Sequence, residues 1–468
     1  MVKKQGQVNI QRRAKRHVRA PEHSWFAVCS PGFEPVVAEE LRAIEAVREI
    51  LPARGGVAFR GKLEGAMEAN VALRSATRVL MRLATFEAVT PKGLRIGLDR
   101  IPWEALLPTD RPTELKCSRR GIPWSTRGRP EQVVFDALKE RFASLGLESP
   151  LVQKRAATGA EGSKGAKEGK GAKEGKGAKE GKGAKGSKMS KSSAGAEGSQ
   201  AKREGQKVLV RLQGSQITVS LDSTGPILTQ RGYRVHPWKA PLRESLAAGI
   251  LLWAGYDGVE GLADPMCGSG TFSIEAALLS QGRDPGGARG FAFQHWPAYS
   301  PAAFRHLLEQ RQARCEGQGG VGLQGREKSS SAPPSIWTRD LRTGALEATE
   351  KNAEEAGVRE LLTVEAGDFF KKEAPGDPGL VVMNPPLGRR LSLRGKAKGR
   401  GGEAAPKNKG GVQKEWAEAL GKRLKEAWSG WRYALVTPAK RWSGYLDLPV
   451  EERLVLPHGG KKVHLLKG

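Results

Sequence analysis

The chain has 468 residues and a formal net charge of +28, with 78 Lys and Arg against 50 Asp and Glu. This balance argues against a basic partner and favours a polyanion, either nucleic acid or an anionic membrane surface. Solvated basic tails that bind nothing specific would give the same total. The length suggests about two to four domains, and the four cysteines lack the paired spacing of a zinc site or a disulfide framework.

No targeting or membrane segment is predicted. The N-terminus is basic but lacks the apolar core of a signal peptide. The best apolar stretch, residues 246–255, is far shorter than the ~20 residues that a membrane helix needs. We therefore expect a cytoplasmic protein in a reducing compartment.

The first part of the chain predicts a small α+β domain. Residues 1–23 are basic and are expected to form a disordered arm. Residues 24–90 predict a β-α-β-α order, which suggests a small α+β unit. The elements expected there are a strand over 26–29, a helix over 33–47, a strand over 56–59 and a helix over 64–81.

Residues 91–230 continue in the same style but contain an insert. We expect a helix over 102–107, a strand over 113–117, a basic loop over 118–121 and a helix over 130–145. Residues 155–206 repeat GAKEGK three times from Gly165, and Met189 is the only large apolar side chain there. Such a segment cannot bury enough surface to offset its ordering entropy, so disorder is expected. Because a Gly-Ser hairpin over 208–221 follows, the insert interrupts a domain.

Residues 231–468 predict a different, α/β architecture. Strands and helices alternate, which is typical of a mostly parallel sheet covered on both faces. The expected elements are helix 241–253, strand 261–264, helix 271–279, strand 335–338, helix 345–356, strands 362–365 and 380–383, helix 416–428 and strand 433–437. An antiparallel hairpin over 454–466 would close one edge, and flexible loops are expected at 312–334 and 391–414.

A glycine-rich turn joins one of these strands to a helix. It reads Asp264-Pro265-Met266-Cys267-Gly268-Ser269-Gly270-Thr271. Glycines let a ligand approach the backbone, and the helix N-terminus favours negative charge. The spacing matches neither a dinucleotide-binding fingerprint nor a phosphate-binding Walker loop. An acid before the turn suits a ligand that carries an ammonium or a sulfonium.

Polar residues also follow the next predicted strands. Asp340 and Asp368 come after the second and third strands, and Asn384-Pro385-Pro386-Leu387 follows the fourth. Any one of these acids could be a helix cap, and Asn384 could belong to an ordinary strand-exit turn. Together they lie where open α/β sheets bind ligands. The rigid prolines would fix the Asn384 amide as an acceptor for an NH₂ group.

These motifs resemble those of THUMP-domain-containing class I S-adenosylmethionine-dependent RNA guanine-N(2)-methyltransferases, of the large-subunit ribosomal RNA type. The resemblance also rests on segments 221–244 and 291–297 and on FAVCSPGFEPVVAEEL near the N-terminus. It implies a Rossmann-like methyltransferase sheet over 231–468, a ferredoxin-like domain over 24–90 and a THUMP RNA-binding domain over 91–230.

The resemblance further implies roles for particular residues. The cofactor S-adenosylmethionine would contact the 264–271 turn, with Asp264, Gly268 and Gly270 at its methionine end. Asp340 would bind its ribose and Asp368 its adenine. The catalytic residues Asn384, Pro385, Pro386 and Leu387 would hold the target amine of an extruded base.

Two positions depart from the family pattern. Leu387 stands where relatives usually have an aromatic residue that stacks on the base, a contact worth about 1–3 kcal/mol. Arg342 stands where relatives often carry a second acid. Both departures leave the core motif intact.

The expected function is therefore methyl transfer to a guanine amine in RNA, without a metal, a membrane or an obligate protein partner. A tRNA guanine or an adenine amine would suit the same Asn-Pro-Pro turn. A non-catalytic RNA-binding ribosome-assembly factor is the other alternative, and failure to bind the cofactor would favour it. Arg119, Arg120 and Arg127 are expected to contact phosphates, although a solvated basic loop would look the same.

The excess charge is unevenly distributed along the sequence. Segments 1–20, 155–206 and 391–414 together carry +20 of the +28. We therefore expect a mildly basic folded enzyme with basic flexible segments that add non-specific attraction to RNA.

Overall fold

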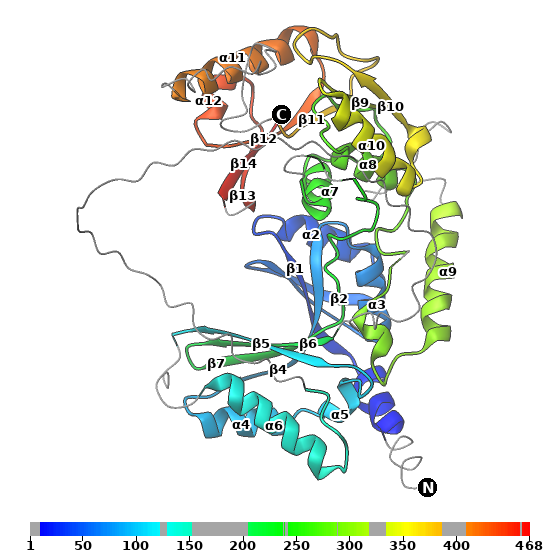
Figure 1. The fold of residues 1–468 in the computed structure, drawn as a ribbon, viewed down its shortest axis with the longest axis vertical. Helices are drawn as coiled ribbons and strands as arrows, with labels where there is room; N and C mark the ends of the chain where they lie inside the picture. Colours follow the sequence, from blue (N-terminus) through cyan, green and yellow to red (C-terminus); the bar gives the residue numbers. More distant parts are fainter. Residues whose placement is uncertain are drawn as a thin grey trace, which may run out of the picture.

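The computed structural model describes residues 10–121, 129–151, 205–236, 238, 242–287, 289–317, 334–385, 409–458 and 461–468. Its two principal parts are each built on a seven-stranded sheet, and the chain runs from the lower to the upper part in Figure 1. No helix among the described residues is both long and apolar enough to cross a membrane.

The N-terminal sheet is continuous across both segments that precede residue 230. Its strand order is β2-β3-β1-β4-β7-β6-β5. The strands are β1 His23–Cys29, β2 Val47–Ala53, β3 Gly56–Gly61, β4 Ala76–Glu87, β5 Thr113–Arg120, β6 Gln206–Gln213 and β7 Gln216–Asp222. Strand β4 pairs with β1 on one side and with β7 on the other. The expected boundary near residue 90 is thus not a break in the sheet.

Helices cover the N-terminal sheet with apolar side chains. They are α2 Glu34–Arg42, α3 Leu63–Ala72, α4 Pro91–Asp99, α5 Trp103–Leu106 and α6 Pro130–Ser144. Figure 1 shows α4 and α6 together beneath strands β4 to β7. Buried Leu94 and Leu98 of α4 and Leu138 of α6 join the core there.

Two predictions for this region were wrong. The helix expected over 64–81 ends at Ala72, because Glu40 accepts hydrogen bonds from the Arg74 and Ser75 backbone N–H groups at 2.5 and 3.1 Å. The chain then enters strand β4. The helix expected to continue to residue 47 ends at Arg42, and strand β2 begins at Val47. Glu40, more than thirty residues away, decides the end of α3, and local periodicity did not reveal either end.

The basic N-terminal arm is ordered from residue 10 onward, contrary to expectation. Residues 10–19 are helical, and the side chains of Ala14 and Val18 are fully buried. Arg13 forms an ion pair with buried Glu104 at 2.8 Å. The His23 imidazole contacts the Val18 carbonyl oxygen at 2.8 Å. Two apolar residues and one buried acid partner therefore anchor this segment, and residues 1–9 lie outside the described part.

The C-terminal sheet confirms the predicted α/β architecture and its antiparallel hairpin. The strand order is β10-β9-β8-β11-β12-β14-β13, and β14 runs antiparallel to both neighbours. The strands are β8 Leu262–Asp264, β9 Ile336–Asp340, β10 Leu362–Ala366, β11 Leu380–Met383, β12 Arg432–Thr437, β13 Glu452–His458 and β14 Lys461–Lys467. The helices are α7 Glu244–Trp253, α8 Thr271–Ser280, α9 Pro301–Gly317, α10 Thr343–Glu355, α11 Lys409–Ala427 and α12 Trp442–Leu446.

Strand β11 shows why this sheet is buried on both faces. All four of its side chains are inaccessible. Leu380 and Val382 join one hydrophobic cluster, whereas Val381 and Met383 join another. Because neighbouring side chains of a strand point to opposite faces, each face of the sheet has its own apolar layer.

The expected flexible segments are shorter than predicted where the structure describes them. Helix α9 continues to Gly317 and helix α11 begins at Lys409. Parts of the expected loops 312–334 and 391–414 are therefore helical. The insert's last residue, Gln206, begins strand β6 and is buried. Its side chain donates to the Asp222 carbonyl and accepts from the Trp296 indole, both at 2.8 Å. Residues 152–204, 318–333 and 386–408 lie outside the described part.

Candidate active site

Four polar residues follow four adjacent strands at one edge of the C-terminal sheet. Asp264 ends β8 and Asp340 ends β9, Asp368 comes two residues after β10, and Asn384 directly follows β11. These strands are neighbours in the order β10-β9-β8-β11, in the upper part of Figure 1. The topology therefore brings the predicted residues together at the carboxyl ends of parallel strands.

Asp264 is a buried carboxylate with one oxygen unused. Its side chain is 1 % exposed, and Oδ2 accepts a 3.2 Å hydrogen bond from the Ser273 hydroxyl. The Thr338 hydroxyl donates in turn to Ser273 at 2.8 Å. Oδ1 has no partner among the described residues. Burial, with a smaller contribution from the charge of Asp340, raises the pKa of Asp264 to about 8.

The glycine turn is held open by its neighbours. Gly268 and Gly270 have φ values of +60° and +75°, in the left-handed region that favours glycine. The Gly268 N–H donates to Asp340 Oδ2 at 3.1 Å. A side-chain carbon added at Gly268 would have only Trp238 within reach, at 4.0 Å. The turn thus leaves a space over Gly268 that a ligand can enter.

Asp340, which is expected to bind the ribose, also holds two backbone N–H groups. Its Oδ1 accepts from the Arg342 N–H at 3.0 Å, while Oδ2 holds Gly268. Burial raises its pKa, although these backbone donors oppose the shift. The carboxylate therefore links the ends of β8 and β9.

The other residues of the turn face inward. Cys267, Ser269 and Thr271 are all buried. The Cys267 thiol lies 3.5 Å from the Thr349 hydroxyl, and the Thr271 hydroxyl accepts from Arg234 at 3.1 Å. The Cys267 and Thr271 side chains therefore support the turn, whereas the Ser269 hydroxyl has no partner among the described residues.

Two residues of α10 were missed by the sequence analysis. The Thr349 hydroxyl donates to the Gly268 carbonyl at 3.2 Å. The buried Asn352 amide donates to the carbonyls of Ser269 and His236, at 3.2 and 3.0 Å. They sit three residues apart on a helix face that otherwise buries apolar side chains. Polar residues at such positions were the available signal, since a buried polar group needs a partner.

The packing of Thr349 against Gly270 gives a stability prediction. An alanine at position 270 would place its Cβ 2.5 Å from Thr349 Cγ2 in a left-handed backbone. We expect Gly270→Ala to lower the free energy of unfolding by about 1–3 kcal/mol, measured by urea denaturation. Gly146→Ala is the control, since it has positive φ but no atom near the added carbon. Equal losses in both variants would contradict the role of the clash.

Asp368 and Asn384 differ in their surroundings. Asp368 is half-buried, and its Oδ1 accepts from the Phe370 N–H at 3.0 Å. Asn384 is also half-buried, and its amide has no partner within the described part of the chain. Pro385 is buried beside it, whereas Pro386 and Leu387 lie outside the described residues. The Asn384 amide is thus available for a ligand.

The expected basic loop over 118–121 is largely a strand. Arg119 and Arg120 belong to β5, because residues 113–120 pair in parallel with β6. Arg119 forms a 3.4 Å ion pair with Glu131, and Arg120 is exposed. Arg127 lies outside the described residues.

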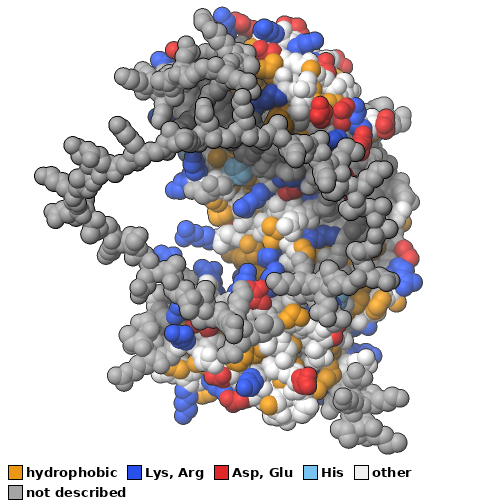
Figure 2. All heavy atoms as spheres, viewed as in Figure 1, with side chains coloured by type: hydrophobic (Ala, Val, Ile, Leu, Met, Phe, Trp, Pro, Cys, Tyr) orange, Lys and Arg blue, Asp and Glu red, His pale blue; other side chains and the backbone are white. Residues whose placement is uncertain are grey.

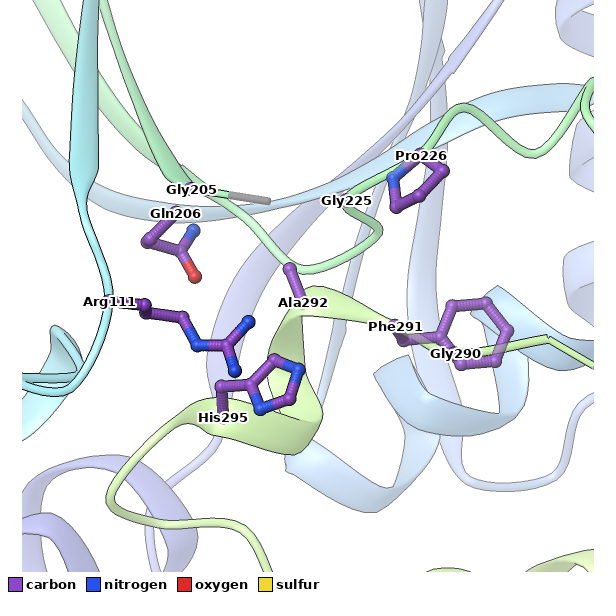
Figure 3. A pocket seen from close by; sticks show the side chains of 9 residues that line it. All are labelled: Arg111, Gly205, Gln206, Gly225, Pro226, Gly290, Phe291, Ala292 and His295. Carbon is purple, nitrogen blue, oxygen red and sulfur yellow. The ribbon is translucent and has the colours of Figure 1, made fainter. Parts of the chain in front are cut away.

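A cavity of about 210 Å³ lies elsewhere, lined by residues at the start of β6 and in segments 225–226 and 290–295. Figure 3 shows the Arg111 and His295 side chains directed toward one another at this cavity. Its lining contains none of the four strand-end residues. Position at the strand ends, rather than cavity size, therefore identifies the candidate site. No cluster of three or more metal-ligating side chains occurs among the described residues.

Two family models match the chain. Residues 231–399 match the "RMKL-like, methyltransferase domain", and residues 24–80 match the "RlmL ferredoxin-like domain". Residues 231–399 thus resemble the methyltransferase domain of RMKL-like proteins. This matched segment contains the glycine turn and all four strand-end residues.

Curated relatives extend the similarity beyond these domains. The "Ribosomal RNA large subunit methyltransferase K/L" of Methylococcus capsulatus is 30% identical over 88% of this chain and 46% of that protein. The K/L protein of Syntrophotalea carbinolica is 29% identical over 94% of this chain and 53% of its own length. The chain thus spans about half the length of these relatives. A "Putative RNA methyltransferase" of Synechocystis is 25% identical over 96% of this chain and 97% of that protein.

Solved structures share the fold. A possible methylase from Clostridium difficile has a TM-score of 0.70 at 22% identity, and the match covers 96% of this chain and 98% of that one. TrmN from Thermus thermophilus has a TM-score of 0.57 at 17% identity, over 95% and 99%. This chain and these proteins therefore share the same fold.

Proposed function

We propose that this chain transfers a methyl group from S-adenosylmethionine to the exocyclic amine of a guanine in large-subunit ribosomal RNA. The observation that carries the proposal is the buried Asp264 with a free oxygen, beside an open glycine turn and next to Asn384 on the adjacent strand. The names of the K/L relatives support ribosomal RNA as the substrate.

The strand-end residues fit the cofactor. When bound, S-adenosylmethionine supplies a methyl group on a positively charged sulfur. Asp264 Oδ1 would accept a hydrogen bond from its ammonium group, which would satisfy a buried oxygen that otherwise has no partner. Asp340 at the neighbouring strand end would hold the ribose hydroxyls, and Asp368 would hold the adenine amine.

Asn384 would orient the nucleophile. The lone pair of a guanine amine is delocalised into the ring, so the amine attacks poorly unless it is aligned. The Asn384 side-chain oxygen would accept one amine proton, and the backbone carbonyl of Pro385 would accept the other. Both acceptors would direct the nitrogen toward the methyl group, and proximity and alignment would supply most of the rate gain. The base must leave its stack to reach this edge.

The rest of the chain would bind the RNA. We assign residues 91–230 to a THUMP domain that carries the RNA to the catalytic sheet, with residues 24–90 as a ferredoxin-like domain. The protein would act in the cytoplasm, without a metal. Arg120 is exposed and suits a phosphate contact, whereas Arg119 is already paired with Glu131.

Mapping of the methylated nucleotide tests the proposal. The full chain is incubated with labelled S-adenosylmethionine and RNA from a strain that lacks the enzyme, and the products are analysed by mass spectrometry. The expected product is N(2)-methylguanine in large-subunit ribosomal RNA. Methylation of a tRNA guanine or of an adenine would overturn the assigned substrate. Saturable cofactor binding without transfer to any RNA would overturn the enzymatic assignment.

A further inference from the structure

One face of the N-terminal sheet carries a row of cationic and hydroxyl side chains that a single leucine interrupts. Residues directly opposite one another in neighbouring strands point to the same face. The pairing register aligns six residues across strands β3, β1, β4, β7, β6 and β5. In that order they are Arg60, Ser24, Arg82, Ser220, Leu209 and Lys116.

A second, shorter row lies beside the first. It consists of Thr85, Thr218, Arg211 and Ser118, on strands β4, β7, β6 and β5. We call the ten residues of both rows the basic face. With a strand spacing of ~4.8 Å, the longer row extends about 24 Å. Neither row contains an acidic residue.

The helices of this region pack on the opposite side of the sheet. The inward side chains Val208, Val210 and Leu212 of β6 are buried, in the core that also contains residues of α4 and α6. On the basic face, Lys116 and Arg211 are exposed. Figure 2 shows several Lys and Arg side chains along the left edge of the molecule at mid-height.

Arg82 lies at the middle of the longer row. Its guanidinium donates to the Ser220 hydroxyl at 2.8 Å and lies over the Phe26 ring, 4.3 Å from the centroid. Burial, together with the like charge of Arg211, lowers the pKa of Arg82 to about 10. The fold thus holds two cations near one another in positions where an anion would relieve their repulsion.

Acidic groups near the basic face are in the flanking positions. Asp222 pairs with Arg78, and Arg60 lies 3.8 Å from exposed Glu49. Glu114 and Glu87 lie on neighbouring positions of β5 and β4, outside the two rows of the basic face. The middle of the face therefore keeps its positive charge.

We propose that the basic face binds the phosphate backbone of the RNA substrate, through Arg82, Arg211 and Lys116. A row of cations and hydroxyl donors suits a polyanion with regularly spaced phosphates, whereas it offers little that could read a base. This inference rests on the proposed function in one respect, that the substrate is RNA. It assigns the sequence-independent part of RNA binding to a sheet surface away from the methyl-transfer site.

The dependence of RNA binding on salt tests the basic face. Arg211→Gln/Lys116→Gln is compared with Arg100→Gln/Lys139→Gln. The control removes two exposed cations from α6 and the end of α4, on the other side of the same sheet. Binding of a labelled oligouridylate is measured by fluorescence anisotropy, without cofactor, between 50 and 200 mM KCl.

The test has distinct outcomes. The basic-face variant is expected to reduce the slope of log K against log salt by about 1.4, and to raise Kd about tenfold at 0.1 M salt. The control is expected to match the wild type. Equal losses in both variants, or no loss in either, would overturn the proposal.

Methyl transfer separates this proposal from the proposed function. The basic-face variant is expected to raise KM for RNA while kcat at saturating RNA stays unchanged. A lower kcat with an unchanged KM would contradict a purely binding role. A wild-type chain that binds RNA with the expected salt dependence but methylates no RNA would instead overturn the proposed function.

Discussion

Replacing Asn384 with alanine is expected to lower the rate of methyl transfer at least about a hundredfold, because the amine would lose the acceptor that aligns it. Asn384 is half-buried and has no partner in the described part of the chain, so the fold should not depend on it. Single-turnover transfer of labelled methyl groups to RNA measures the rate, and calorimetry measures cofactor binding. Affinity for S-adenosylmethionine is expected to stay within about twofold of the wild type.

Asn352 is the contrasting variant for this experiment. It is an asparagine of helix α10, and it is buried and supports the glycine turn through the Ser269 carbonyl. Asn352→Ala is expected to weaken cofactor binding and to lower the free energy of unfolding by about 1–3 kcal/mol. If Asn384→Ala weakened cofactor binding as much as Asn352→Ala, or retained transfer, the role given to Asn384 would be wrong.

Asp264→Asn is expected to raise the Kd for S-adenosylmethionine by about 10- to 150-fold, since a hydrogen bond to a charged group contributes ~1.5–3 kcal/mol. The pH dependence is more specific. The pKa of Asp264 is about 8, so below that pH cofactor binding requires release of a proton. An α-amino group titrates near ~7.7–8.0 and must be protonated to donate to the carboxylate.

The affinity of the wild-type protein is therefore expected to be greatest near pH 8 and to fall up to about tenfold for each pH unit below it. Calorimetric titrations from pH 6 to 9 measure this profile. In Asp264→Asn, the affinity for S-adenosylmethionine is expected to stay constant below pH 8, because asparagine has no proton to release. A wild-type affinity that is constant between pH 6 and 8 would contradict a carboxylate–ammonium contact.

The same carboxylate makes the stability of the free protein depend on pH. The pKa of Asp264 in the folded chain is raised above the ~3.9 of an unfolded aspartate. The folded state therefore holds a proton that the unfolded chain releases, and stability is lost as pH rises from about 4 to 8. Asp264→Asn is expected to be more stable than the wild type at pH 8.5, measured by urea unfolding without cofactor. A less stable variant at that pH would show that the Asp264 carboxyl supports the fold.

The sequence predicted the candidate site better than it predicted the elements around it. Asp264, Asp340 and Asn384 could be found because each lies at the end of a short strand, and parallel strands of an open sheet end at one edge. The β4 strand was misread as the end of a helix. Its state depends on pairing with β1 and β7, and the residues of β7 lie more than a hundred positions away.

Other features depended on burial that no local pattern reveals. The ordered N-terminal arm depends on Val18 and on the contact of Arg13 with Glu104. The support of the glycine turn by Thr349 and Asn352 requires α10 to pack beside it. A basic sequence looks the same whether it is solvated or anchored, and a polar helix residue looks the same whether it faces water or a backbone carbonyl.

Sequence alone determined the alternation of strands and helices, and with it the α/β sheet and the polar residues at its carboxyl edge. Local periodicity and turn chemistry are properties of neighbouring residues, so they can be read directly. Only the tertiary structure decided that one sheet unites the segments before residue 230, and that its cations align into a row. It also decided that one oxygen of Asp264 is left without a partner among the residues that the structure describes. Strand register and burial arise from contacts between distant residues, and these form only when the chain folds.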